Sequence, residues 1–131
     1  MYLLDTNICI YIINRSPMNV VNRIKSLKPS QIKLSSISLG ELEYGIYKSK
    51  NVEKNKSALI DFVSAFDIVN FDDSDAVVFG MIRADLEMRG EVIGSYDMQI
   101  AAQAVARELT LVTNNTREFG RVQRLRLENW A

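Results

Sequence analysis

Apolar and polar positions along the chain follow two periods, which predict short strands separated by longer helices. Short apolar runs typical of buried parallel strands occur at both ends of the chain. The expected strands cover residues 2–4, 31–37, 67–71, 109–113 and 125–127. In the intervening segments apolar residues recur at helical spacing, and the expected helices begin near Thr6, Val20, Ser38, Val52, Asp73 and Ser95.

Strands and helices that alternate in this way form a parallel sheet between two layers of helices. We therefore predict an α/β fold with a mostly parallel sheet of about four to five strands, flanked by helices on both faces. A chain of 131 residues is long enough for one such domain and too short for two, so a single domain is expected over residues 1–131.

Charge, hydropathy and cysteine content indicate the compartment and the partners of the protein. The 16 basic and 16 acidic residues cancel, so any attraction to nucleic acid must be local. No apolar run approaches the ~18 residues of a membrane span, and Asp5 interrupts the N-terminus where a signal peptide would be apolar. The single cysteine, Cys9, excludes an internal disulfide. We expect a cytoplasmic protein without a membrane partner.

The chain contains no histidine, which excludes several chemistries. Ser-His and Cys-His nucleophiles, histidine-ligated zinc and histidine acid–base cleavage of RNA are all impossible. Any catalysis must use carboxylates, lysines, tyrosines, hydroxyls or amides.

Three carboxylates occupy equivalent places in the predicted fold. Asp5 follows the first strand, Glu41 is expected in the first turn after the second, and Asp97 in the first turn of the helix before the fourth. The carboxyl ends of parallel strands share one edge of a sheet, which would bring these side chains together. A structural alternative exists for two of them: Asp5 as a helix N-cap, and Glu41 as the partner of Ser38 in a capping box.

Converging carboxylates repel one another unless a cation lies between them. One or two magnesium or manganese ions would suit oxygen ligands, and such ions can activate a water against a phosphodiester. This would allow a protein without histidine to hydrolyse a phosphodiester bond.

Four motifs in this order resemble those of the PIN-domain family, and more narrowly the VapC-type toxins of bacterial toxin–antitoxin pairs. The motifs are Leu3-Leu4-Asp5-Thr6-Asn7, then Ser35-Ser36-Ile37 with Glu41-Leu42 and Gly45, then Gly94-Ser95-Tyr96-Asp97 with Ile100-Ala101-Ala102, and finally Leu111 to Phe119. Each motif alone is weak, but together they extend over nearly the whole chain.

The resemblance implies a magnesium- or manganese-dependent endoribonuclease that inhibits translation. It also implies a homodimer and a cognate VapB-type antitoxin whose tail blocks the acidic pocket, in a larger hetero-oligomer. Relatives with a similar N-terminus and a similar loop at residues 114–119 suggest tRNA as the RNA substrate, cut in the anticodon loop of the initiator tRNA.

Asp5, Glu41 and Asp97 fall on the family's three core acidic positions. Asp5 and Asp97 would bind the principal ion, and Glu41 would ligate it or act as general base. The sequence departs from the family at Asn115, where many members have aspartate; this amide could orient the water or a second ion. Glu118, at another often acidic position of the same loop, could restore the missing charge.

Polar, basic and aromatic residues near these motifs are candidate contacts for RNA or an antitoxin. They include Thr6, Arg117, Arg121 and Arg124, with Arg126 beside them, because arginine forks suit phosphate oxygens. The lysines from Lys48 to Lys56 could extend this track or form a solvated face. Tyr44, Tyr47 and Tyr96 could stack on unpaired bases, or pack in the core or a dimer interface.

Two other functions remain open on sequence grounds. One is a non-catalytic or attenuated PIN module that binds RNA or an antitoxin. The other is a haloacid-dehalogenase-like phosphatase, which also places Asp after a strand but needs a second Asp where Asn7 stands.

Overall fold

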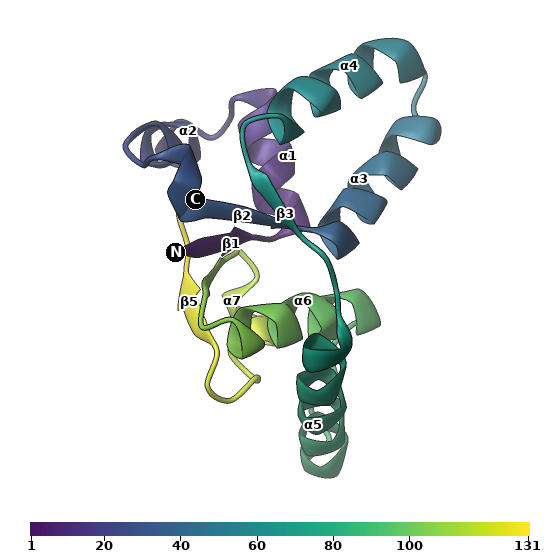
Figure 1. Ribbon diagram of the computed structural model, residues 1–131, viewed down its shortest axis with the longest axis vertical. Helices are drawn as coiled ribbons and strands as arrows, with labels where there is room; N and C mark the ends of the chain where they lie inside the picture. Colours follow the sequence, from purple (N-terminus) through teal and green to yellow (C-terminus); the bar gives the residue numbers. More distant parts are fainter.

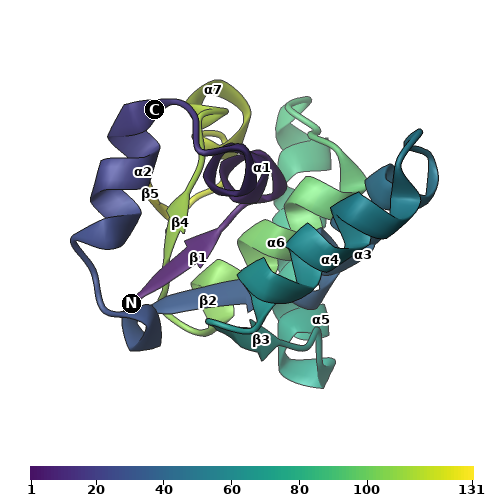
Figure 2. The same cartoon turned by 90° about the horizontal axis from the view of Figure 1, so that it is seen from above.

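In the computed structural model, which describes residues 1–131, five parallel strands form one sheet. The strands are β1 (Tyr2–Leu4), β2 (Ile32–Ser35), β3 (Asp67–Val69), β4 (Thr110–Val112) and β5 (Arg126–Glu128). Their order is β3-β2-β1-β4-β5, so the first strand lies in the centre (Figure 2). The predicted α/β class and parallel sheet are confirmed.

Helices cover both faces of the sheet (Figure 1). One face carries α1 (Thr6–Asn14), α2 (Met18–Lys25), α3 (Ser36–Tyr47) and α4 (Val52–Val63); the other carries α5 (Asp73–Arg89), α6 (Ser95–Ala106) and the short α7 (Thr116–Phe119). A single 3₁₀ turn, Pro29–Gln31, precedes β2. None of these helices combines the length and the apolar character that a bilayer crossing requires.

The two layers have separate hydrophobic cores because neighbouring strand residues point to opposite faces. Leu3 and its partner in register, Leu111, pack against α5 and α6. Leu4 and its partner Val112 pack against α1 to α4. All four side chains are fully buried, as expected of a parallel sheet covered on both sides.

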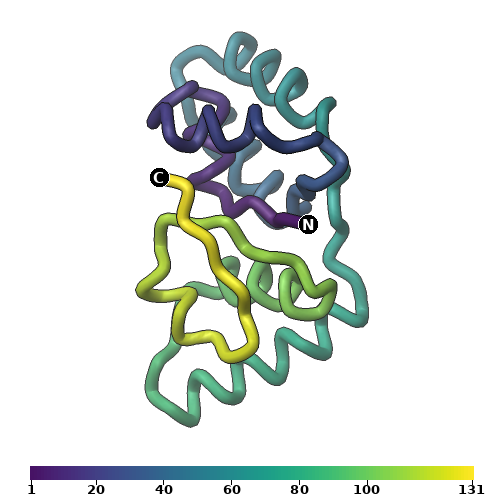
Figure 3. Tube along the Cα trace, turned by 90° about the vertical axis from the view of Figure 1, so that its left-hand side faces the viewer, coloured from purple at the N-terminus to yellow at the C-terminus, as the bar shows by residue number.

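The C-terminal segment runs along one side of the molecule and ends beside the N-terminal helices (Figure 3). There the Trp130 ring packs edge-on against Tyr2, with 5.3 Å between ring centroids. The Arg23 guanidinium of α2 lies over both rings, 5.9 Å from the Tyr2 centroid and 5.6 Å from that of Trp130. The end of the chain therefore packs against β1 and α2.

The order of the strands creates a topological switch point between β1 and β4 at the carboxyl edge of the sheet. From β1 the chain moves through β2 and β3 on one side, and it returns to place β4 and β5 on the other side. The connections that leave β1 and β4 therefore diverge to opposite faces. In open α/β sheets, ligands bind at such a switch point.

Several boundaries differ from the sequence prediction. The α3 helix begins at Ser36, because the Ser35 side chain caps it by accepting a hydrogen bond from the Ile37 amide. The predicted capping box of Ser38 and Glu41 is therefore wrong. The segment after β4, expected to be a loop, contains α7. The α6 helix begins at Ser95 as expected, with Gly94 as its N-cap.

Candidate active site

Asp5 is the N-cap of α1, as the structural alternative expected, but it is also deeply buried. Its carboxylate accepts a hydrogen bond from the Ile8 amide at 2.9 Å, and only 5% of the residue is exposed. The pKa of Asp5 is raised, mainly by burial and also by the negative charge of Glu41, although a hydrogen bond from Thr113 opposes the shift. A cap alone needs no burial and no second carboxylate.

Glu41 lies in the second turn of α3, one turn later than the sequence suggested. The Thr6 hydroxyl, from the first residue of α1, donates a hydrogen bond of 2.7 Å to Glu41 Oε1. This bond ties α1 to α3 and holds the Glu41 carboxylate toward the end of β1. Thr6, predicted as a contact for RNA or antitoxin, thus has an internal role in orienting Glu41.

Asp97 approaches the site from the opposite face of the sheet, because it lies in the first turn of α6. The residue is half-buried, and burial raises its pKa from 3.8 to about 6, assisted by the negative charges of Glu41, Glu118 and Asp5. These carboxylates come from α3, α7 and the end of β1. The structure therefore brings four acidic side chains into one electrostatic group.

Asn115 and Glu118 are linked to each other in this group. The side-chain amide of Asn115 donates to Glu118 Oε2 at 3.1 Å, and the Asn115 backbone amide donates to the Thr113 hydroxyl at 2.9 Å. With its NH₂ engaged, Asn115 has its carbonyl oxygen left for a cation or a water. Glu118 supplies the negative charge that Asn115 lacks.

No cationic side chain balances these four carboxylates. The ion pairs of the chain involve other acidic residues, among them Glu43, Asp85 and Asp75. No three acidic or thiol side chains lie close enough together to coordinate one metal ion in their present positions. The uncompensated oxygens nevertheless fit a hard divalent cation, which accepts carboxylate and amide oxygens and keeps several waters.

The chain as a whole is similar to proteins of a known family. The family model for the PIN domain matches residues 2–125. The chain belongs to the PIN-domain family. Membership confirms the resemblance found in the sequence motifs, and it shows that the phosphatase alternative is wrong.

Relatives and solved structures of VapC proteins cover this PIN domain almost completely. It is 46% identical over 130 residues to Ribonuclease VapC2 of Rickettsia felis, across 98% of this chain and 97% of the relative. It is 43% identical over 130 residues to the tRNA(fMet)-specific endonuclease VapC of Shigella flexneri, across 99% and 98% of the two chains. The crystal structure of DNA-bound VapBC from Salmonella typhimurium has a TM-score of 0.94 at 40% identity, across 99% and 98%.

The arginines predicted to contact RNA or an antitoxin lie in different parts of the structure. Arg117 is exposed on α7 of the PIN domain and makes no ion pair, so it remains a candidate. Arg121 donates to the Val92 carbonyl at 3.2 Å, which gives it a structural partner. Arg124 precedes β5, and Arg126 is paired in register with Thr110 at the start of β4. Both therefore lie at the amino edge of the sheet, opposite the carboxylates. The expected location beside the acidic pocket is wrong, and contact of Arg124 with RNA or an antitoxin stays a prediction.

Two features that support the site were missed in the sequence. Thr113 is fully buried and its hydroxyl connects Asp5 with the Asn115 backbone. Gln103 of α6 is also fully buried; it accepts a hydrogen bond from the Ser35 hydroxyl and donates to the Val69 carbonyl at 3.1 Å. This network joins α6, which carries Asp97, to β2 and β3. The available signal for Gln103 was its place as a polar residue within the apolar run of residues 100–106.

Proposed function

We propose that this PIN domain is an endoribonuclease that hydrolyses RNA phosphodiester bonds with a divalent cation, Mg²⁺ or Mn²⁺. The observation that carries the proposal is the group of four carboxylates at the switch point, without a cationic partner. PIN-domain nucleases generally use divalent metal ions. Relatives named as ribonucleases, at 43% and 46% identity over nearly the whole chain, support the same activity.

Asp5 and Asp97 would hold the principal ion, because they approach from opposite faces of the sheet. Such an ion, when bound, lowers the pKa of a water and neutralises charge that develops on a phosphate. Burial and the neighbouring carboxylates raise the pKa of Asp97 to about 6, so a cation bound beside it would stabilise its ionised form. Asn115 and Glu118 would complete the oxygen set on the α7 side, either for a second ion or for a water.

Glu41 would either ligate the ion or take a proton from the attacking water. Its Oε1 accepts the Thr6 hydrogen bond, so Oε2 is the oxygen left for this work. Holding one oxygen fixes the direction of the other, which is how a positioned general base gains efficiency. Thr6 is therefore a positioning residue.

Replacing Thr6 by valine should test this assignment. Thr6→Val keeps the shape of the side chain and removes the hydroxyl that holds Glu41, so RNA cleavage should fall about 10-fold to 100-fold. Thr6→Ser, which restores the hydroxyl, should recover most of the rate. The measurement is kcat at saturating Mg²⁺, with the unfolding temperature as a control. Equal rates for Thr6→Val and wild type would remove Thr6 from the mechanism.

For the substrate we propose tRNA, with cleavage of the initiator tRNA in its anticodon loop and inhibition of translation in the cytoplasm. The support is the name of two relatives, the tRNA(fMet)-specific endonuclease VapC of Shigella flexneri and that of Salmonella typhimurium. Purified protein should be incubated with total tRNA in Mg²⁺, in Mn²⁺ and with a chelator. Cleavage only in the first two is expected. Binding of RNA without any cleavage would favour the non-catalytic module instead.

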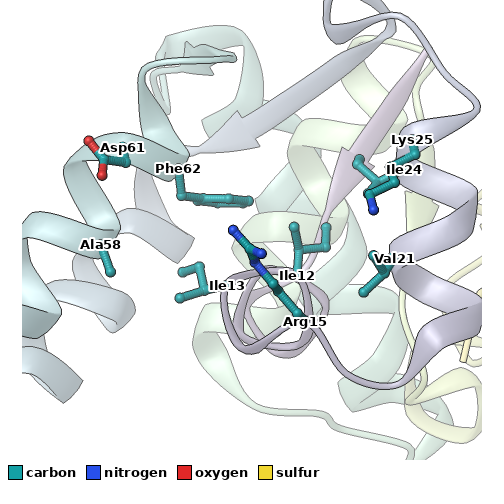
Figure 4. Close-up of a pocket in the computed structure, with 9 residues that line it drawn as sticks. All are labelled: Ile12, Ile13, Arg15, Val21, Ile24, Lys25, Ala58, Asp61 and Phe62. Atoms are coloured by element: carbon teal, nitrogen blue, oxygen red, sulfur yellow. The ribbon is translucent and has the colours of Figure 1, made fainter.

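An antitoxin partner is the third part of the proposal, since the R. felis and Salmonella neighbours are VapBC complexes. A pocket of about 580 Å³ between α1, α2 and α4 is the surface we assign to its apolar side chains (Figure 4). Apolar side chains form most of its lining, with three charged ones: Ile12, Ile13, Arg15, Val21, Ile24, Lys25, Ala58, Asp61 and Phe62. The antitoxin tail would continue from there along α1 to the carboxylates.

Ala58 offers a way to test this surface without disturbing the core, because it is exposed on α4. Ala58→Arg should obstruct the pocket and weaken binding of the cognate antitoxin. RNA cleavage by the free protein should stay at the wild-type rate. Undiminished antitoxin binding by Ala58→Arg would contradict the assignment.

We also propose a homodimer that uses the exposed face of α5. Val77, Met81 and Met88 follow one another at helical spacing and are all exposed. Exposed apolar side chains in such a row mark an interaction surface. A second copy of the chain would bury this face, and light scattering should then give twice the chain mass of 14.9 kDa.

A further inference from the structure

A second pocket, of about 660 Å³, opens directly beside the carboxylates. Its volume lies within the range of about 300–1,000 Å³ that is typical of ligand pockets. Thr6 and Glu41 form the side toward the acidic group, and α3 and α6 supply the rest: Ser36, Ile37, Gly40, Tyr44 and Tyr96. Anything bound in this pocket lies next to the Thr6–Glu41 hydrogen bond.

Two tyrosines from different elements face this pocket and are left largely exposed. Tyr44 on α3 is 66% exposed, and Tyr96 in the first turn of α6 is 59% exposed. Neither packs against another aromatic ring of the chain. Tyr96 directly precedes Asp97, so its position is tied to the acidic group.

The third tyrosine of the same region differs in its surroundings. Tyr47 lies on α3 and is 65% exposed, almost the same as Tyr44, but it does not line the pocket. Its ring has a lysine neighbour as the Tyr44 ring does, with the Lys56 ammonium 5.8 Å from the Tyr47 centroid. Tyr47 is therefore a matched control for Tyr44.

We propose that the pocket formed by Tyr44 and Tyr96 is a stacking site for an unpaired nucleobase next to the bond that is cut. The inference rests on the proposed ribonuclease activity and deepens it. Aromatic side chains recognise single-stranded RNA by stacking on its splayed bases. Lys48, whose ammonium lies 5.5 Å from the Tyr44 centroid, places a positive charge where a neighbouring phosphate would pass.

The position of the pocket favours RNA over a protein segment. A strand whose phosphate lies at the four carboxylates has its next nucleotide within reach of Glu41 and hence of the pocket. The pocket also requires the base to be unstacked from its neighbours, so it would select loops and single strands over duplex RNA. It therefore provides a physical basis for choosing unpaired RNA in a protein with no net charge.

Stacking is tested with a short unstructured oligoribonucleotide that the wild-type protein cuts. Tyr44→Ala and Tyr96→Ala should each raise KM about tenfold with little change in kcat, since one stacked base contributes roughly that much affinity. Tyr44→Phe and Tyr96→Phe should retain wild-type KM because the ring remains. Tyr47→Ala should behave as wild type.

A gain-of-bulk variant tests the same pocket without removing a ring. Gly40 lines the pocket, and a Cβ built there meets no atom within 4 Å. Gly40→Ala should have a small effect on KM, and Gly40→Leu a large one, while the unfolding temperature should not fall because alanine and leucine favour helix over glycine.

The substrate side is tested by moving one abasic nucleotide along the oligoribonucleotide. An abasic nucleotide at one position beside the cut should strongly reduce cleavage by wild type. The same abasic nucleotide should not further reduce cleavage by Tyr44→Ala. No cleavage by wild type at all would defeat the proposed function itself. Cleavage by wild type with unchanged KM in both alanine variants would overturn the stacking site alone. Loss of the dimer in these variants, with stacking unaffected, would assign the tyrosines to a protein interface and also overturn it.

Discussion

Replacing Asp97 by asparagine should abolish RNA cleavage and at the same time raise the unfolding temperature of the metal-free protein. The loss of cleavage should be at least about 100-fold, because a ligand of the proposed ion and its charge disappear together. The gain in stability follows from the neighbours of Asp97. Its ionised form is disfavoured by burial and by the charges of Glu41, Glu118 and Asp5.

The size of this stability effect depends on pH. The pKa of Asp97 is 3.8 when unperturbed and about 6 in the folded protein, so between these values the folded state binds more protons than the unfolded state. Stability therefore falls as pH rises through this window and stays lower above pH 6. Because the residue is only half-buried, the cost is about 1 kcal/mol, or roughly 3 °C in unfolding temperature.

Thermal unfolding in a chelator measures the stability change and its dependence on pH. Asp97→Asn should be more stable than wild type at pH 7.5, and the difference should vanish near pH 4. Asp85→Asn serves as a control, because Asp85 already pairs with Arg89 at 2.8 Å and its charge is compensated. A destabilised Asp97→Asn protein would show that Asp97 is not part of a repulsive acidic group.

Two substitutions of Asp5 should separate its two roles. Asp5→Asn keeps a side chain that caps helices well, and it removes the charge. We expect a protein as stable as wild type with at least about 100-fold less cleavage. Asp5→Ala should lose the same activity and in addition about 1–3 kcal/mol of stability, because the cap and a buried hydrogen bond both disappear.

The comparison needs the rates and the unfolding free energies of both variants. Equal activity in Asp5→Asn and wild type would show that Asp5 is only a cap. The pH dependence of cleavage by wild type should also reflect the acidic group. Protonation competes with the cation, so at sub-saturating Mg²⁺ the rate should fall as pH drops towards about 6, the pKa of Asp97 in the metal-free protein.

The fold could be predicted from the sequence because the apolar pattern is strong where the strands are buried on both faces. All five strands were found, although the structure shortens most of them, and Gly90 ends α5 in the left-handed conformation expected of a helix stop. The errors arose where local chemistry had two solutions. Ser35 and Ser38 are both possible caps, and only the register of β2 decides that Ser35 is used.

The candidate site was predictable as a set of carboxylates but not as a set of contacts. Parallel strands place their carboxyl ends at one edge, so Asp5, Glu41 and Asp97 could be grouped from the order of elements alone. The bond between Thr6 and Glu41 joins residues 35 positions apart and depends on the packing of α1 on α3. Arginines near Asn115 in sequence were misplaced because β5 begins at the opposite edge of the sheet.

The most direct test of the acidic group is a calorimetric titration of the metal-free protein with Mn²⁺ at pH 7.5, in wild type, Asp97→Asn and Asp5→Asn. Saturable binding in wild type is predicted, with affinity at least about tenfold lower in each variant and an unfolding temperature that rises with Mn²⁺ only in wild type. Equal Mn²⁺ affinity in all three proteins, or no binding by wild type, would contradict a divalent cation site at the acidic group.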